Sequence, residues 1–236
     1  IDKKNDRLII NDRYSKTVSF LDLEGNFLER KKVNFTGEYF APMPNGEYAF
    51  FMDISSVDGE NTVIIADKNL KKIRSYFPQN QNHNFIVGVP TRLTTTEEGT
   101  VLFSPPYDNK IYEITENGFI AKYCFNCTFG KNLPNDVAVT ISPQNRSKIL
   151  NNEGYIVFRG DIINNVNSLY FSFTYGSDSS FDDHYLFFFD KESGKGKTVY
   201  KYSKENFDVL LFNEPKGSYE DYFISVMGPE KLNTID

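Results

Sequence analysis

The sequence contains no Trp, only two Cys and two His, and no long apolar run. No stretch approaches the roughly 18 to 20 consecutive apolar residues that a membrane-spanning helix needs, so no such helix is predicted. Two cysteines cannot supply a four-Cys zinc site, and two histidines are too few for sites that use several His ligands. Apolar residues at helical spacing are scarce as well, so a mainly helical fold is not expected.

The sequence also lacks a concentration of basic residues. It carries 26 Lys and Arg against 32 Asp and Glu, which gives a formal net charge of −6. The pairs Lys3-Lys4, Lys31-Lys32 and Lys71-Lys72 stand apart, beside turns or strand ends. Binding to nucleic acid needs a continuous basic face, so nucleic acid is excluded as the expected partner.

Aromatic residues and turn signals are plentiful. The chain has 22 Phe and 15 Tyr, and such rings pack well on pleated sheets. The stretch from Gly99 to Phe125 shows the pattern, because its short apolar runs around Leu102, Ile111 and Phe119 are separated by the turns 106–109 and 117–118. Three strands in a meander cannot cover their own apolar faces, so the unit must pack against others like it.

Similar units recur along the chain. Val18, Val63 and Ile111 occupy equivalent positions, 45 residues (from 18 to 63) and 48 residues (from 63 to 111) apart. Blades of about 40 to 50 residues with four antiparallel strands are typical of a β-propeller, and four to five such blades fit this chain. The fourth copy, aligned at Leu186, is longer, because residues 132–161 form an insertion in which 143–152 are predicted to be helical.

The predicted strands span most of the chain. They cover residues 7–12, 17–22, 27–33, 38–42, 47–53, 62–67, 72–77, 101–103, 111–114, 119–125, 168–176, 184–190, 196–202, 208–213 and 221–227. The fold class predicted is all-β.

The repeats resemble the six-bladed β-propeller lipoproteins of gut Bacteroidetes, a family related to NHL-type propellers. The segments that carry the resemblance are DRLIINDRYSKTVSFLDLEGNFLERKK, LFSPPYDNKIYEIT, FGKNLPND, NNEGYIVFRGDIINNVNSLYFSFTYG and GSYEDYFISVMGPEKL. The resemblance implies one propeller domain over residues 1–236 that lacks the N-terminal blades. It also implies a place in the cell envelope, as an outer-membrane lipoprotein or a periplasmic protein, with any lipid anchor outside this sequence.

Two motifs could carry metal or redox chemistry. Cys124 and Cys127 form a C-x-x-C pair, but neither further zinc ligands nor a βαβ context accompanies it, so structural cysteines at a strand end are expected. The loop GSDSSFDD, with Asp178, Asp182 and Asp183, has enough oxygen ligands for Ca²⁺. It lacks the spacing of an EF-hand, so a solvated loop is the simpler interpretation.

No catalytic constellation is visible in the sequence. His83 and His184 are expected at the surface, and no G-x-S-x-G elbow is present. These features favour a non-enzymatic propeller that has no cofactor. Its expected ligand is a protein, a glycan or a peptide. The alternatives are a calcium-dependent lactonase or lyase, and an accessory subunit of an outer-membrane nutrient-uptake complex.

The candidate binding residues lie in the loops that join the second strand of each blade to the third. Such loops emerge on one face of a propeller, so their side chains form one composite surface. Aromatic and charged residues there suit a polar ligand or a protein partner. The predicted set is Arg13, Tyr14, Tyr107, Asp108, Tyr175 and Asp178.

Overall fold

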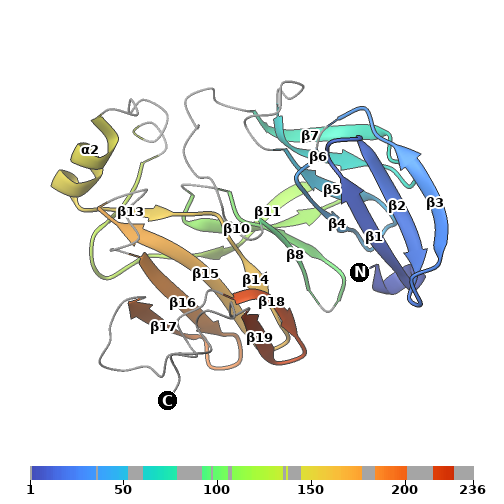
Figure 1. Ribbon diagram of the computed structural model, residues 1–236. Coiled ribbons are helices and arrows are strands. Elements are labelled where there is room, and N and C mark those ends of the chain that lie inside the picture. Colours follow the sequence, from blue (N-terminus) through green and yellow to red (C-terminus); the bar gives the residue numbers. More distant parts are fainter. Residues whose placement is uncertain are drawn as a thin grey trace, which may run out of the picture.

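The computed structural model describes residues 2–35, 37–52, 61–78, 92–96, 98–105, 108–134, 137, 145–176, 184–200 and 215–225. These residues form an all-β structure of five sheets that follow one another in an arc (Figure 1). Antiparallel pairing of consecutive strands dominates, as a β-propeller requires. The predicted fold class is confirmed.

The first sheet has the order β1-β2-β3 and the second has the order β4-β5-β6-β7. The 3-10 helix η1 (Lys3–Asn5) precedes them. The strands of the first sheet are β1 (Arg7–Asp12), β2 (Thr17–Asp22) and β3 (Phe27–Lys32). Those of the second are β4 (Tyr39–Pro42), β5 (Tyr48–Phe51), β6 (Asn61–Ala66) and β7 (Lys72–Pro78).

The third sheet is again a four-stranded meander, and the fourth is larger. The third contains β8 (Leu93–Thr95), β9 (Val101–Phe103), β10 (Lys110–Thr115) and β11 (Gly118–Cys124). The fourth contains β12 (Lys131–Asn132), β13 (Tyr155–Phe158), β14 (Ile163–Asn164), β15 (Ser168–Tyr175), β16 (His184–Asp190) and β17 (Lys195–Tyr200). The hairpin of β18 (Pro215–Tyr219) and β19 (Tyr222–Ser225) is the fifth.

The predicted equivalence of the repeats is confirmed. Val18, Val63, Ile111 and Leu186 lie on β2, β6, β10 and β16, which hold the same place in the first four sheets, next to the outermost strand. All four side chains are buried. An apolar residue recurs at this position because its side chain packs between its own sheet and a neighbouring sheet.

The insertion in the fourth copy contains the predicted helix, observed as α2 (Arg146–Glu153). It ends at Gly154, whose φ of 66° is the left-handed conformation that glycine favours, and whose N–H donates to Asn151 O and Leu150 O. β12 pairs with β13 in parallel over two residues. The predicted strand 208–213 lies outside the described residues.

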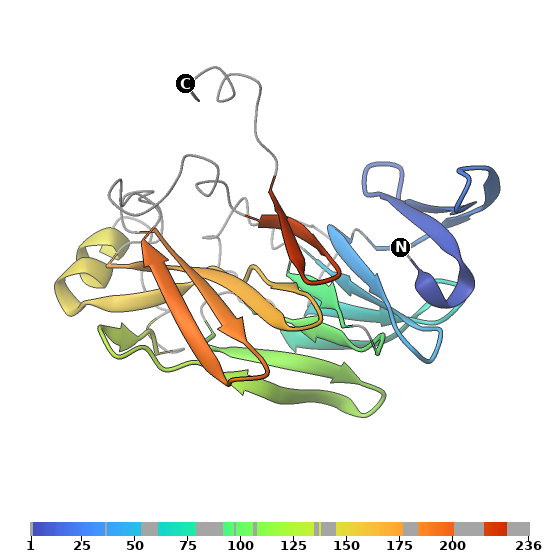
Figure 2. The same cartoon turned by 90° about the horizontal axis from the view of Figure 1, so that it is seen from below.

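The innermost strands lie next to one another along the arc. β4 contacts β8, β8 contacts β14, and β14 contacts β18. Figure 2 shows the β18–β19 hairpin between the fourth sheet and the N-terminal end of the chain. In the fourth sheet β13 and β14 both pair with β15, at different places along it. Between these two places, the side chain of Asp161 accepts the N–H of Ser172 on β15 at 2.9 Å.

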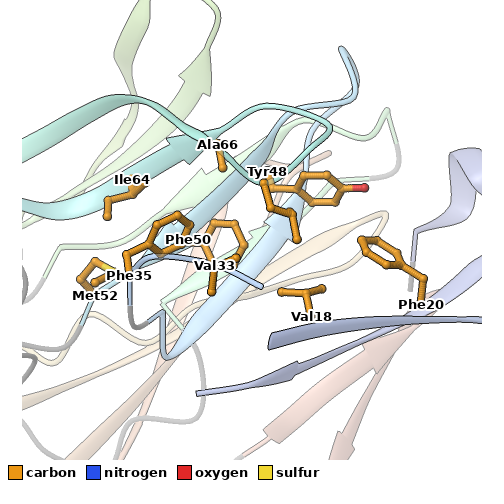
Figure 3. Packing of buried hydrophobic residues seen from close by; sticks show 10 residues of the cluster. Val18, Phe20, Val33, Phe35, Tyr48, Phe50, Met52, Ile64 and Ala66 are labelled. Carbon is orange, nitrogen blue, oxygen red and sulfur yellow. The ribbon is translucent and has the colours of Figure 1, made fainter. Parts of the chain in front are cut away.

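Separate apolar cores hold neighbouring sheets together. Between the first two sheets, Val18 and Phe20 of β2 face Tyr48 and Phe50 of β5 (Figure 3). Phe20 and Phe50 are fully buried, and burial of such a side chain contributes about 1.5 to 3 kcal/mol. Further clusters lie between the later sheets, so the packing unit is the interface between two blades.

The opposite face of the first sheet is more open. Ile10, Phe27 and Leu28 are exposed there, at 54%, 61% and 54%. β1 forms one edge of that sheet. In the described part of the chain, no helix has the length and apolar character needed to cross a membrane.

Candidate functional site

A cavity of about 530 Å³ lies where the innermost strands end, and we call it the axial pocket. It is lined by the ends of β4, β8 and β14, by the turns that follow β4, β8, β14 and β18, and by η1. Pro42, Thr95, Asn164 and Ser218 are the strand residues in its wall. Every sheet from the second to the fifth therefore contributes to one site.

Tight turns build the wall, because the chain reverses direction directly after each innermost strand to form the second strand of the blade. Met43, Thr96 and Asn165 open three of these turns, and their N–H groups donate to backbone oxygens of Glu47, Thr100 and Ser168 at 2.8 to 3.0 Å. Gly46 and Gly99 adopt φ of 86° and 81°, a conformation that a side chain would strain. The wall is thus largely fixed by the backbone.

Two asparagines, one at the end of β14 and one in the turn that follows it, stand out in the pocket wall. Asn164 and Asn165 are each 4% exposed. Asn164 Oδ1 and Asn165 Nδ2 are enclosed polar atoms that have no hydrogen-bond partner in the described structure. Most buried polar atoms in proteins are paired, so two adjacent exceptions beside a cavity single out this part of the wall.

The charges around the pocket are balanced. Asp2 is buried and pairs with Arg7, whose Nε lies 2.9 Å from its Oδ2. Lys4 Nζ donates to the backbone oxygen of Pro44 at 2.5 Å, and Glu220 lies on the exposed β18–β19 turn. A pocket whose buried carboxylate is already paired, and whose wall holds one further cation and one further anion, favours an uncharged ligand.

A second polar cluster lies at the other end of the innermost strands. Arg92 is buried, donates to the backbone oxygen of Arg159 at 2.7 Å and lies over the ring of Phe51 at 5.1 Å. Arg159 Nη1 lies 3.2 Å from His184 Nε2. His184 is 1% exposed, so its predicted surface position is wrong: it begins β16 in the interior and contacts an arginine there.

The predicted residues Arg13 and Tyr14 lie together in the turn between β1 and β2. Arg13 donates to Glu38 at 3.1 Å and to the Tyr14 hydroxyl at 3.1 Å, and its guanidinium lies 4.9 Å from the centre of the Tyr14 ring. Tyr14 is 86% exposed. Asp12 fixes this turn by accepting the N–H groups of Tyr14 and Ser15, and its hydrogen bonds with Ser15 lower its pKa.

Asp108 lies just before β10, where it supports that strand. It accepts the N–H of Lys110 at 3.1 Å and the hydroxyl of Tyr112 at 2.7 Å. Burial and the bond to Asp108 both raise the pKa of Tyr112. Asp108 therefore has a structural role in this loop.

Tyr175 ends β15, on the side of the fourth sheet next to α2. Its ring packs 5.9 Å from the ring of Phe129, and a Cβ at Gly154 would lie 3.0 Å from its hydroxyl. The structure thus brings Arg13 and Tyr14 together, whereas Asp108 and Tyr175 belong to the third and fourth sheets. Tyr107 and Asp178 lie outside the described residues, as do His83, Asp182 and Asp183.

The C-x-x-C pair lies at the end of β11, as predicted. Both thiols are free; Cys124 is exposed, and Cys127 packs partly against the core next to the fourth sheet. Burial raises the pKa of Cys127, which makes its thiol less reactive. Among the described residues, no three His, Cys, Asp or Glu side chains come close enough together to hold a metal ion.

The sequence predicts binding residues in the loops at one end of the blades. It does not predict the axial pocket, which lies at the other end. The signal that could have found it is the run Asn164-Asn165-Val166-Asn167 directly before the long strand at Ser168. Asn and Asp favour turns, so this run predicts a hairpin. The strand before the run is too short to show an alternation of apolar and polar residues.

Comparison with known proteins places the chain in a family. Residues 1–236 match the profile of the family described as "Domain of unknown function (DUF4934)". No curated protein matches the sequence.

A solved structure of another protein shares its fold. A Bacteroides fragilis protein assigned as exported superposes with a TM-score of 0.76 at 13% identity, covering 100% of this chain and 67% of that one. BamB from Moraxella catarrhalis gives 0.46 at 14% identity, covering 85% of this chain and 51% of that one. A catalytically inactive virginiamycin B lyase from Staphylococcus aureus, solved with quinupristin, gives 0.42 at 13% identity, with 91% and 71% covered.

Proposed function

We propose that this chain, which belongs to the DUF4934 family, is a ligand-binding β-propeller that holds its ligand in the axial pocket. The observation that carries the proposal is the position of that pocket, an approximately 530 Å³ cavity built by turns from four successive sheets. Ligand pockets typically enclose about 300 to 1,000 Å³ and combine apolar walls with a few placed polar groups. Pro42, Met43 and Val166 supply the apolar part here, and Asn164 and Asn165 the polar part.

A binding role fits the side chains of the pocket better than a catalytic one. Its one buried carboxylate among the described lining residues, Asp2, is held by Arg7 at 2.9 Å and by the Asn5 amide at 2.9 Å, so both donors compete with any substrate for it. A general base needs a free lone pair within reach of the proton that it removes. The calcium-dependent lactonase or lyase is the second candidate function, and metal analysis of the purified protein tests it.

The cell envelope is the proposed location. The support is the shared fold of the exported Bacteroides fragilis protein, together with the resemblance to six-bladed, NHL-like propeller lipoproteins. Within that compartment the partner is a protein, a glycan or a peptide, and an outer-membrane nutrient-uptake complex is the assembly that the resemblance favours. Cell fractionation and co-purification from detergent-solubilised membranes test these points.

The pocket assignment is tested by filling the pocket. Val166 lines it and is 38% exposed, so Val166→Trp places an indole in the cavity. Ile120→Trp is the matched control, because Ile120 is 61% exposed on β11 and does not line the pocket. In a thermal-shift screen of peptides and oligosaccharides, hits should disappear with Val166→Trp and persist with Ile120→Trp. Hits that survive Val166→Trp would place the site elsewhere, with the turn of Arg13 and Tyr14 as the next candidate.

A further inference from the structure

The amide of Asn165 is fixed in one orientation by its own turn. Its Oδ1 accepts the backbone N–H groups of Asn167 at 3.1 Å and Ser168 at 2.6 Å. Only an oxygen can accept from two N–H groups, so the remaining atom, Nδ2, is a donor. That donor has no partner in the described structure.

Asn164 supplies the complementary acceptor. Its backbone is held, because its carbonyl oxygen accepts the Ser218 hydroxyl at 2.7 Å and its strand pairs with β15 at Leu169. Its side-chain Oδ1 has no partner in the described structure. The last torsion of an Asn side chain has a broad preference, so a ligand can turn this amide toward the cavity at little cost.

An enclosed polar atom without a partner costs about 1 to 3 kcal/mol, and a ligand that offers the missing partner recovers that free energy. The two atoms require one acceptor and one donor, side by side, which is the pattern that the C=O and N–H of one residue present along the edge of an extended chain. The charge balance of the pocket and the aliphatic side chains of Pro42, Met43 and Val166 suit an uncharged segment with aliphatic side chains. The described residues that line the pocket include no aromatic ring on which a sugar could stack.

We propose that the axial pocket binds an uncharged, extended peptide segment, one residue of which accepts from Asn165 Nδ2 through its C=O and donates to Asn164 Oδ1 through its N–H, once a shift of the β14–β15 turn opens these two enclosed atoms to the cavity. This inference rests on the proposed function, because it assigns a ligand class to the same pocket. Asn165 has a second role as the cap of its turn, whereas the Asn164 side chain is available for the ligand alone.

The experiment titrates the blocked peptide N-acetyl-Ala-Val-Ala-amide and, separately, maltotriose into ¹⁵N-labelled protein. The peptide should shift the side-chain NH₂ signals of Asn164 and Asn165. Asn164→Ala should weaken peptide binding about tenfold, the size of one hydrogen bond of about 1.4 kcal/mol. Asn45→Ala is the matched control, because Asn45 occupies the equivalent β4–β5 turn, is exposed and does not line the pocket. The peptide affinity of this variant should equal that of the unaltered protein.

The outcomes separate the two proposals. Peptide binding that Val166→Trp abolishes and Asn164→Ala leaves unchanged overturns the amide pairing and leaves the pocket in place. Maltotriose binding that Val166→Trp abolishes, without peptide binding, overturns the peptide class only. If neither probe binds in a way that Val166→Trp affects, the pocket itself is wrong and the inference falls with it.

Discussion

A four-stranded blade has an inner turn, which joins its first strand to its second, and an outer turn, which joins its third strand to its fourth. The two turns lie at the same end of the sheet, but different side chains cap them. In the second sheet the register sets Pro42, Tyr48, Ala66 and Lys72 side by side, so the β4–β5 and β6–β7 turns are neighbours. Three outer turns are capped by aspartates: Asp22, Asp67 and Asp190 accept backbone N–H groups at 2.7 to 2.9 Å. Inner turns are capped by the neutral side chains of Asn45, Thr96 and Asn165.

Exposure explains the difference at the Asn165 turn. The outer turns are in water, which stabilises an ionised carboxylate, and side-chain and backbone hydrogen bonds lower the pKa of Asp22 and Asp190 further. The Asn165 turn is enclosed, where an unpaired charge would be costly. An amide caps the enclosed turn without a charge and keeps a second polar atom for another partner. The Asn165 turn therefore combines a structural role with the binding role that we propose for it.

The largest effect expected is the loss of the enclosed cap. Asn165→Ala leaves the N–H groups of Asn167 and Ser168 without their side-chain acceptor, and the free energy of unfolding should fall by about 1 to 3 kcal/mol. Asn45→Ala removes an exposed cap with one such bond and should change it by less than about 0.5 kcal/mol. Urea denaturation compares the two. Equal losses would break the distinction between enclosed and exposed turns.

The second effect is on the acid side of the stability curve. Because the pKa values of Asp22 and Asp190 are lowered in the folded chain, both carboxylates stabilise it above their unfolded pKa. That contribution is lost as the pH falls through the lowered folded values. The double variant Asp22→Asn with Asp190→Asn lacks both titrating groups, so it should lose less stability than the unaltered protein between about pH 5 and pH 2, measured as urea midpoints. An unchanged acid slope would show that these caps do not act through charge.

A smaller effect of opposite sign is expected at Asn164. Asn164→Ala removes an enclosed oxygen that has no partner in the described structure, so stability should stay the same or rise by up to about 1 kcal/mol. Thermal unfolding without ligand measures it. A clear loss of stability would mean that the Asn164 side chain supports the fold, and the pocket would then lose its dedicated acceptor.

The smallest effect is expected at the opposite end of the blades. Tyr14 is 86% exposed, and Tyr14→Ala should change the free energy of unfolding by less than about 0.5 kcal/mol. Ligand affinity should also be unchanged if the axial pocket is the site. An affinity loss with Tyr14→Ala, at unchanged stability, would move the site to the turn of Arg13 and Tyr14.

The outer three strands of the blades could be predicted and the innermost ones mostly could not. Strands such as β2 and β16 carry long alternating or apolar runs, and their predicted bounds, 17–22 and 184–190, match the structure. β8 has three residues and β14 has two, so neither is long enough to show a period. β4 is the exception, since the aromatic pair at 39–40 and the turn at Pro44 mark it.

The candidate site was missed for the same reason. Its residues lie at the ends of short strands, and turn residues such as Asn and Gly are what any hairpin needs. The sequence does not reveal that the ends of β4, β8 and β14 converge, because convergence depends on the packing of whole blades. Nor does it indicate that Arg159 approaches His184, which lies 25 residues further along the chain.

The wall of the axial pocket draws on residues from Asp2 to Glu220, almost the full length of the chain. Closing such long loops costs entropy before any contact repays it, so the pocket should be among the last features to form during folding. Binding of the ligand that we propose is consequently a measure of complete assembly, which no single blade can report. By mass action a ligand at a hundred times its dissociation constant adds about 2.7 kcal/mol to stability, and here that gain is shared by every sheet that contributes a turn.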